Sequence, residues 1–479
     1  MLRLKHRWNS LSNAAKSSIA FAISSILVKG ISFITTPIFT RIISQDQYGI
    51  VSTYNSWMTI IDVFAVVGLT SAGVFNVGMK DHKENRDQFI SSLLVLCNIS
   101  TILVFGVIFL LKIPFGNDFI LPSTLLISMF IHFMFNPAYI FWITRKRYEY
   151  KYKTPFLITV ISTVVTQLLS IIIILNIATP NQGALRIWTN TLFALIINVP
   201  VYLMLLAKGK KFFDIALWKE VLIYALPLLP HYLAQHIMSS SDRIMISNLY
   251  SSTGTAIYSV ASSISMISSI IWQSINASLV PYTFDKLENN REKEVNRVVI
   301  PILIVFAAMC ITITLIAPEI LTILAPKEYY EGIYAIPPIA ATAFVSALYN
   351  IYANIEFYHK KTWWISLSTI VAAGVNLGLN FLVIPKFGYI GAAYTTLISQ
   401  IVLSLMHYFG YKRCQKDPVF NNKIILLVTL FAIIFCLLCN FCYSNVFVRY
   451  GIIIGILVIM IFNRKMIISK IQEIKKKTM

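Results

Sequence analysis

Charged residues are scarce in this sequence. Only 13% of its 479 residues are Asp, Glu, Lys or Arg, whereas 57% are apolar, and the mean hydropathy is +0.72. A soluble domain typically carries about 25% charged residues, so this composition excludes a soluble globular protein. Apolar runs of about twenty residues, the length that spans a bilayer, recur along the chain. The sequence therefore predicts a polytopic helical membrane protein.

Several motifs are also missing. No nucleotide-binding P-loop is present, which argues against ATP hydrolysis, and no loop between the apolar runs is long enough for a catalytic domain. No small-residue cleavage site follows the first apolar run, so we expect no cleavable signal peptide. Three of the six cysteines, Cys436, Cys439 and Cys442, share an apolar helix without His or acidic partners, which favours packing over metal binding. We predict a protein that is not an enzyme and holds no resident metal or cofactor.

The apolar runs predict an all-α integral membrane protein with about fourteen transmembrane helices. The predicted spans are residues 18–40, 50–76, 89–111, 119–143, 155–177, 186–206, 221–248, 253–281, 298–318, 333–356, 364–384, 389–410, 423–442 and 447–463. Fourteen is an even number, so both termini are expected on the same side of the membrane.

The basic residues support this topology independently. Of the 40 Lys and Arg residues, 32 lie in the two tails and in every second loop, and only 6 lie in the loops on the opposite side. Basic residues accumulate on the cytoplasmic side of membrane proteins, so both termini are predicted to be cytoplasmic. The net charge of +20 then reflects loops that lie against an anionic leaflet, and we expect no nucleic-acid partner.

Polar residues form stripes on the first two predicted helices. On the first helix they are Ser25, Lys29, Ser32, Thr36 and Thr40, and on the second Ser52, Asn55, Thr59 and Asp62. Spacings of three and four place each set on one helical face. The turn between the helices runs from Arg41 to Gly49.

Lys29 and Asp62 are predicted to lie at similar depth in the membrane. Lys29 is about 18 Å along its helix from Arg41, and Asp62 is about 20 Å along its helix from Gly49. A charge near the bilayer centre costs about 2.5–3.5 kcal/mol on insertion scales, so it faces a partner or a wet cavity rather than lipid. Two interpretations stay open: a buried Lys29–Asp62 pair that joins two helices, or a polar lumen whose charges meet a substrate or a proton.

The same arrangement recurs later in the chain. The predicted seventh helix carries His231, Gln235, Ser239, Asp242 and Arg243, and the eighth, which begins near Gly254, carries Gln273 and Asn276. A weaker third copy of the turn contains Gly388 and Gly391. The glycines permit sharp turns, and we predict that these turns, with Arg41, act as gates. Because both helix pairs start in the same direction, the repeat is parallel.

The repeat predicts three parts of the chain. An N-terminal lobe of six helices spans residues 1–207, and a second six-helix lobe spans 208–413, the two being related by a pseudo-two-fold axis along the membrane normal. Residues 414–479 form two additional helices and a basic tail.

The motifs Thr40–Gly49, Ser240–Ile246 and Phe387–Ala393 resemble those of the polysaccharide-exporter family, which includes the Wzx-type O-antigen flippases, within the superfamily of the MurJ and MATE transporters. The resemblance implies a two-lobed transporter of the bacterial inner membrane with a central cavity that opens alternately to each side. It implies a polyprenyl-diphosphate-linked oligosaccharide as the cargo, with Lys29 and Arg243 as cationic residues for the diphosphate. Asp62 is acidic, whereas a purely cationic cavity is expected, and this difference is compatible with coupling to an ion.

Three functional readings compete. The first is the flippase, for O-antigen, capsule or another surface polysaccharide, coupled to H⁺, Na⁺ or the membrane potential. The second is a cation-coupled small-molecule antiporter of the MATE kind, which calls for several acidic residues in the lumen. The third, a membrane-bound polymerase or ligase, calls for a large outer loop that this chain lacks. We expect a monomer, with membrane lipids, polysaccharide polymerase and glycosyltransferases as candidate partners.

Overall fold

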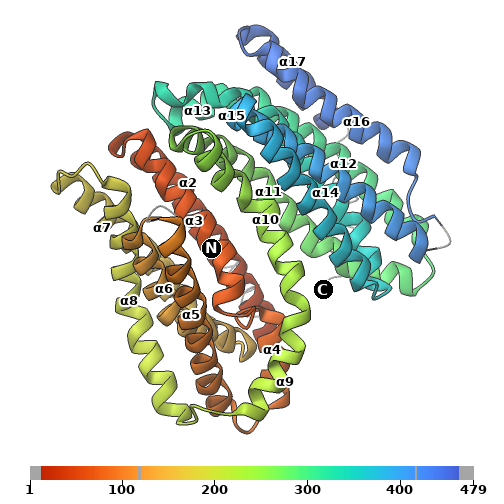
Figure 1. Ribbon diagram of the computed structural model, residues 1–479. Coiled ribbons are helices and arrows are strands. Elements are labelled where there is room, and N and C mark those ends of the chain that lie inside the picture. Colours follow the sequence, from red (N-terminus) through yellow and green to blue (C-terminus); the bar gives the residue numbers. More distant parts are fainter. Residues whose placement is uncertain (1–11, 117–119, 416–417, 463–479) are drawn as a thin grey trace, which may run out of the picture. The chain divides into compact units, whose positions relative to one another are not determined.

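The chain is helical throughout the part that the structure describes. A computed structural model describes residues 12–116, 120–415 and 418–462, and within these ranges it contains helices and no strand (Figure 1). The predicted all-α membrane fold is therefore confirmed. The described residues form two compact units, Met1–His236 and Ile237–Met479 by their outer limits.

Within the described residues, the first unit contains eight α-helices, one 3₁₀ turn and the beginning of a ninth α-helix. They are α2 (Asn13–Ile42), α3 (Gln45–Ala65), α4 (Ala72–Asp81), α5 (Arg86–Phe115), α6 (Ser123–Tyr148), α7 (Lys153–Asn176), α8 (Gln182–Gly209), α9 (Ile215–Ala225) with the 3₁₀ turn η1 (Leu226–Leu228), and the start of α10 (Leu229–Leu249). Pro227 lies in η1, where its missing N–H is compatible with the tighter turn.

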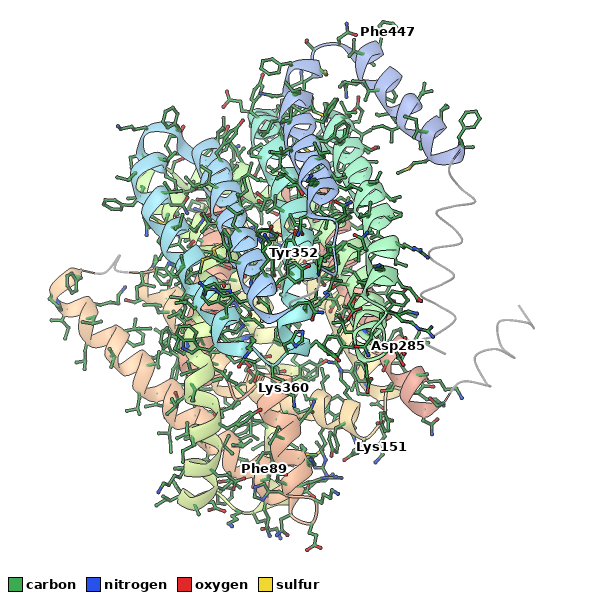
Figure 2. All side chains as sticks on the ribbon, turned by 90° about the vertical axis from the view of Figure 1, so that its right-hand side faces the viewer. Phe89, Lys151, Asp285, Tyr352, Lys360 and Phe447 are labelled. Atoms are coloured by element: carbon green, nitrogen blue, oxygen red, sulfur yellow. The ribbon has the colours of Figure 1, made fainter. Side chains whose placement is uncertain are left out.

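The second unit contains the rest of α10 and seven further helices. They are α11 (Ser252–Glu288), α12 (Glu292–Leu315), α13 (Ala317–Leu324), α14 (Ile336–Tyr358), α15 (Thr362–Cys414), α16 (Asn422–Leu438) and α17 (Val446–Phe462), with 3₁₀ turns η2 (Lys327–Ala335) and η3 (Cys439–Cys442). In this unit Asp285 and Lys360 lie at one end, and Phe447 lies at the other (Figure 2).

Eleven described helices are long and apolar enough to cross a membrane, and the shorter α17 is also apolar. The count of fourteen spans stays a prediction. Two of the predicted spans, 364–384 and 389–410, lie in the single element α15, which is kinked at Gly388. There φ is 58° and ψ is −145°, a conformation that only glycine adopts without strain.

The core of the first unit is built from aromatic and branched side chains of α3, α4, α5, α6, α8 and α9. Phe75 and Phe141 stack with ring centroids 5.1 Å apart, and Phe89 lies beside Phe75 at 6.1 Å. All three rings are essentially inaccessible to solvent. The helix α7 packs against α2 and α8 instead.

The core of the second unit is formed by α11, α12, α14, α15 and α16. Trp272 packs on Phe306 with ring centroids 5.0 Å apart, and Tyr352 of α14 stacks on Tyr411 of α15 at 5.5 Å. The helix α16 buries Ile425 and Cys436 in the same core. Residues of 414–479, which we predicted as a separate pair of helices with a tail, thus share the core of this unit; the tail beyond residue 462 lies outside the described residues.

The boundary between the compact units falls at His236, inside α10, whereas the predicted boundary was 207/208. The reason is α9, which packs against α4 and α5. The indole Nε1 of Trp218 donates to the backbone oxygen of Ser92 at 3.1 Å and to its hydroxyl at 2.9 Å. These contacts keep α9 with the first six predicted helices.

Candidate functional site

The predicted polar stripe on α2 contains one half-buried lysine and several hydroxyls that bond to their own helix. Lys29 is half-buried, Ser32 is exposed and Thr36 is buried. Thr36 donates to the carbonyl oxygen of Ser32 at 2.9 Å, and Ser32 donates to that of Val28 at 3.1 Å. Hydrogen bonds of this kind satisfy the hydroxyl within the helix, so these side chains contribute a polar surface rather than links to other helices.

The stripe on α3 has the same character. Asn55 is exposed, whereas Thr59 and Asp62 are half-buried. Thr59 donates to the carbonyl oxygen of Ser56 at 2.8 Å. The helix α2 packs mainly along α7, and α3 packs against α5 and α8. Both interpretations of Lys29 and Asp62, a structural pair and a polar lumen, stay predictions.

The stripe on α10 divides into an open part and a closed part. Gln235 and Ser239 are exposed and His231 is half-buried, but Asp242 is only 4% exposed. The predicted stripe therefore ends at Ser239. Beyond that residue α10 closes against α11 and α15, which enclose the carboxylate of Asp242.

Four side chains donate hydrogen bonds to the Asp242 carboxylate. Tyr258 of α11 and Thr396 of α15 donate to Oδ2, each at 2.6 Å. Asn380 and Asn376 of α15 donate to Oδ1 at 2.7 and 3.4 Å. These four neutral donors compensate the buried carboxylate, and no ion pair of Asp242 occurs among the described residues.

A second layer of hydrogen bonds supports this network. Ser241 donates to Oδ1 of Asn376 at 2.9 Å, and Thr395 donates to Oδ1 of Asn380. Both asparagines are fully buried. They stand four residues apart in the apolar helix α15, a pattern that signals a polar face. We did not single out Asn376, Asn380 or Tyr258 from the sequence.

Arg243 lies beside this network, with its guanidinium carbon 5.8 Å from the centre of the Tyr258 ring. Its Nε donates to the hydroxyl of Ser259 at 3.2 Å, and its Nη1 donates to the carbonyl oxygen of Ser239 at 3.1 Å. On α11, the predicted residue Gln273 is exposed, and Asn276 accepts a hydrogen bond from Asn354 of α14 at 2.9 Å. Asn276 therefore contributes to packing within the second unit.

The predicted turn residues lie at helix ends and at the kink of α15. Arg41 is exposed in the last turn of α2 and donates to the carbonyl oxygen of Pro37, and Gly49 is buried in the first turn of α3. In the second unit Gly254 and Gly388 both face the ring of Tyr250, and a Cβ on either would come within 3 Å of that ring. Gly391 follows the kink, where a Cβ would meet Val383 and Phe387. A gating role for these turns stays a prediction.

A second buried ionisable group lies outside every predicted site. Glu356 of α14 and His407 of α15 are fully buried, and Nδ1 of His407 is 2.7 Å from Oε2 of Glu356. The imidazole stacks on Tyr349, with ring centroids 5.5 Å apart. Oε1 of Glu356 has no hydrogen-bond partner among the described residues. The sequence could have revealed this pair, because ionisable residues are rare in membrane spans and both residues lie within predicted spans.

These groups offer the chemistry of ligand binding and exchange. The half-buried cations Lys29 and Arg243 suit an anionic group. The buried carboxylate of Asp242, bonded by hydroxyl groups and side-chain amides, offers oxygen atoms of the kind that a hard cation prefers.

Comparison with solved structures places the fold. The lipid II flippase MurJ, in an inward closed conformation, superposes with a TM-score of 0.67 at 17% identity, over 94% of this chain and 99% of MurJ. An inward-facing multidrug resistance MATE family transporter of the MOP superfamily superposes with a TM-score of 0.58 at 14% identity, over 82% of this chain and 94% of the transporter. The chain is thus a polytopic α-helical membrane protein with the fold of the MOP superfamily.

The sequence identifies the family more narrowly. The pattern of the polysaccharide biosynthesis protein family matches residues 14–287, more than half of the chain, and the chain belongs to this family. It is 21% identical over 410 residues to Lsg locus putative protein 1 of Haemophilus influenzae, covering 84% of this chain and 98% of that protein. It is 24% identical over 205 residues to the capsular polysaccharide biosynthesis protein CapF of Staphylococcus aureus, covering 42% of this chain and 52% of that protein.

Proposed function

We propose that this protein is a flippase that moves a polyprenyl-diphosphate-linked oligosaccharide from the cytoplasmic to the outer leaflet of the bacterial plasma membrane, for O-antigen, capsule or another surface polysaccharide. One observation carries the proposal: a member of the polysaccharide biosynthesis family has the fold of a lipid II flippase over 94% of its length. A charged diphosphate with its sugars does not cross hydrocarbon unaided, so such a pathway needs a protein with a polar interior.

In this proposal the cargo moves by alternating access through a polar, cationic cavity. Lys29 on α2 and Arg243 on α10 hold the diphosphate, the arginine through its planar fork of donors. The exposed amides of Asn55 and Gln235 bond to sugar hydroxyls. The protein carries its cargo without changing a covalent bond in it.

We further propose that the Asp242 network couples transport to a cation or a proton. The carboxylate lies on α10, and the amide NH₂ groups of Asn376 and Asn380 and the hydroxyl of Thr396 converge on it from α15. Coupling predicts that Na⁺ or a change in pH alters transport in the natural protein and has a reduced effect in Asp242→Asn. Export from vesicles under imposed Na⁺ and pH gradients measures this, and equal responses in the two proteins contradict it.

The experiment that tests the flippase is restoration of surface glycan in a flippase-deficient bacterial strain, with the amount of membrane protein measured in parallel. Lys29→Ala is expected to abolish restoration and Lys29→Arg to retain part of it, because the positive charge anchors the diphosphate. The double variant Lys29→Ala, Asp62→Ala is expected to be abundant and inactive. An abundant and fully active double variant would show instead that the two residues form a structural pair.

The proposed topology has a test of its own. Reporter fusions after Lys210, Asn289 and the C-terminus are expected to read cytoplasmic, and fusions near Ser252 and Glu331 are expected to read external. The charge asymmetry of the loops is the physical reason. A reversed reading at Asn289 contradicts the fourteen-span arrangement.

A further inference from the structure

An elongated groove runs along the second unit between α14, α15 and α16. Its volume is about 520 Å³, and its walls are mainly aliphatic. The lining residues are Val345, Leu348, Tyr352, Ile401, Ser404, Leu405, Tyr408, Asn422, Lys423, Ile425, Leu426, Thr429, Leu430 and Ile433. On α16 they extend from Asn422 to Ile433, about 16 Å along the helix axis at 1.5 Å per residue.

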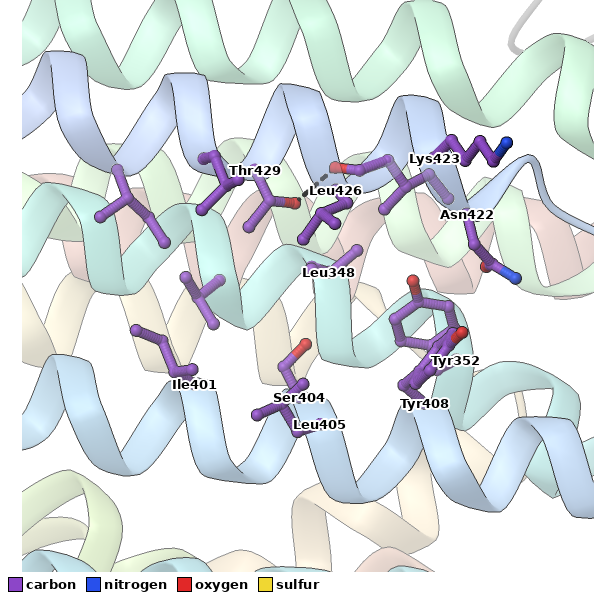
Figure 3. Close-up of a pocket in the computed structure, with 14 residues that line it drawn as sticks. Leu348, Tyr352, Ile401, Ser404, Leu405, Tyr408, Asn422, Lys423, Leu426 and Thr429 are labelled. Atoms are coloured by element: carbon purple, nitrogen blue, oxygen red, sulfur yellow. Dashed lines mark hydrogen bonds between the residues drawn. The ribbon is translucent and has the colours of Figure 1, made fainter.

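The polar groups of this groove gather at one end. Lys423 and Asn422, at the start of α16, lie at the same end as Tyr352 and Tyr408 (Figure 3). The ammonium of Lys412 lies 4.8 Å from the centre of the Tyr408 ring and adds a second positive charge. Away from this end the side chains shown are mainly aliphatic, and the hydroxyl of Thr429 donates to the carbonyl oxygen of Ile425 within its own helix. The groove thus combines a cationic mouth with an apolar channel.

We propose that the groove binds an anionic glycerophospholipid, with an acyl chain along α16 and the headgroup phosphate at Lys423 and Lys412. Charge complementarity carries the assignment, because two lysines and two tyrosine hydroxyls at the mouth favour an anion. In the predicted topology the basic residues around 411–422 are cytoplasmic, which places this mouth at the anionic cytoplasmic leaflet.

The mouth also selects among anionic lipids. The amide oxygen Oδ1 of Asn422 is buried and has no hydrogen-bond partner among the described residues. An amide oxygen accepts hydrogen bonds, so after rotation of this side chain toward the mouth it would favour a ligand with a donor close to its phosphate. The glycerol hydroxyls of phosphatidylglycerol supply such a donor. A simple polyprenyl phosphate, whose headgroup at neutral pH consists mainly of acceptor oxygens, fits this mouth less well.

The aliphatic walls suit an extended acyl chain, which is much thinner than a helix about 10 Å wide. This site is independent of the proposed cargo, because its residues are not among those assigned to the diphosphate or to coupling.

The test uses the purified full-length protein, depleted of lipid in detergent, with defined phospholipids added back. Binding of phosphatidylglycerol and phosphatidylcholine with identical acyl chains is measured by native mass spectrometry, and thermal unfolding is followed in parallel. We expect the natural protein to bind phosphatidylglycerol more tightly than phosphatidylcholine. In Lys423→Gln the ratio of the two affinities is expected to fall about fivefold. Lys293→Gln, which removes an exposed lysine of α12 outside the groove, is the control and is expected to retain the preference.

A second pair of variants tests the channel itself. Leu426→Trp fills the groove and is expected to lower phosphatidylglycerol binding, whereas Leu427→Trp, on the neighbouring lipid-exposed face of α16, is expected to leave it unchanged. Equal binding of the two phospholipids by the natural protein overturns the proposal. An equal loss of the preference for phosphatidylglycerol in Lys423→Gln and Lys293→Gln overturns it as well. Displacement by polyprenyl phosphate at equal concentration would assign the groove to the cargo lipid, and a dimer mass lost in Leu426→Trp would assign it to a second copy.

Discussion

The helix pairs α2–α3 and α10–α11 carry similar polar stripes but use them differently. In the first unit the hydroxyls of Ser32, Thr36 and Thr59 bond to carbonyl oxygens of their own helices. In the second unit Ser241 and Asp242 bond to α11 and α15. Hydrogen bonds between helices fix their register, whereas bonds within one helix do not. The polar stripe of α10 therefore joins it to α11 and α15, whereas in the first unit α3 is joined to α6 outside its stripe, through Tyr54 and Ser128.

The largest expected effect comes from removing the centre of the network in the second unit. Asp242→Ala leaves buried donors of Tyr258, Asn380 and Thr396 without their acceptor, at about 1–3 kcal/mol for each donor that finds no new partner. We expect the free energy of unfolding to fall by about 3 kcal/mol or more. Chemical denaturation in mild detergent measures this.

The matched control for Asp242 is Ser239→Ala, one turn earlier on α10 and exposed. Its effect is expected to stay within about 0.5 kcal/mol, as for other exposed substitutions. Similar losses in both variants would show that the network does not hold the helix pair together.

The kink of α15 provides the next largest effect. Gly388→Ala places a side chain at a φ of 58° and ψ of −145°, and its Cβ would come 2.9 Å from the ring of Tyr250. We expect a loss of about 1–3 kcal/mol of stability, the cost of a residue in a sparsely populated conformation. The midpoint of thermal unfolding measures it.

Gly374 provides the contrast on the same helix. No atom lies within 4 Å of the position that its Cβ would occupy, and Ala is favoured over Gly in a helix interior by up to about 1 kcal/mol. Gly374→Ala is therefore expected to leave stability unchanged or to raise it. If Gly388→Ala and Gly374→Ala change the stability equally, the kink does not require glycine at residue 388.

A smaller effect separates the hydroxyls of the two units. Ser241→Ala removes a buried hydrogen bond to Asn376 and is expected to cost about 1 kcal/mol. Ser32→Ala removes only a bond within α2 from an exposed side chain and is expected to cost less than about 0.5 kcal/mol. Thermal unfolding of the two variants under identical conditions compares them, and a larger loss for Ser32 would reverse the comparison.

The smallest effect concerns the loop that follows α6 in the first unit. Burial raises the pKa of Glu149, but hydrogen bonds from Arg145 and Lys151 outweigh it and hold that pKa below its usual range. The ionised Glu149 therefore contributes to folding stability above its unfolded-state pKa. That stability is lost as the pH falls through the lower pKa of the folded state. We expect Glu149→Gln to lower the unfolding temperature slightly at pH 7 and to have little effect under acidic conditions. A difference that persists at acid pH contradicts the charge interaction.

The sequence by itself determined the membrane class and the helical fold. Hydrophobic runs of bilayer length must form helices, because backbone groups in hydrocarbon have to satisfy their own hydrogen bonds. The motif around Gly388 also indicated a sharp turn, which the structure has at that residue.

Only the tertiary structure decided which polar residues meet. Asp242 and Asn380 are 138 residues apart, and Glu356 and His407 are 51 apart. Periodicity places a residue on a face of its own helix but does not tell which helix covers that face. Asp242 therefore shares a stripe with the exposed Ser239 yet lies buried, because α11 and α15 close over the end of α10. Likewise the apolar sequence of α16 favours lipid and protein contacts equally, and only its packing against α12 and α14 placed Ile425 and Cys436 in the core.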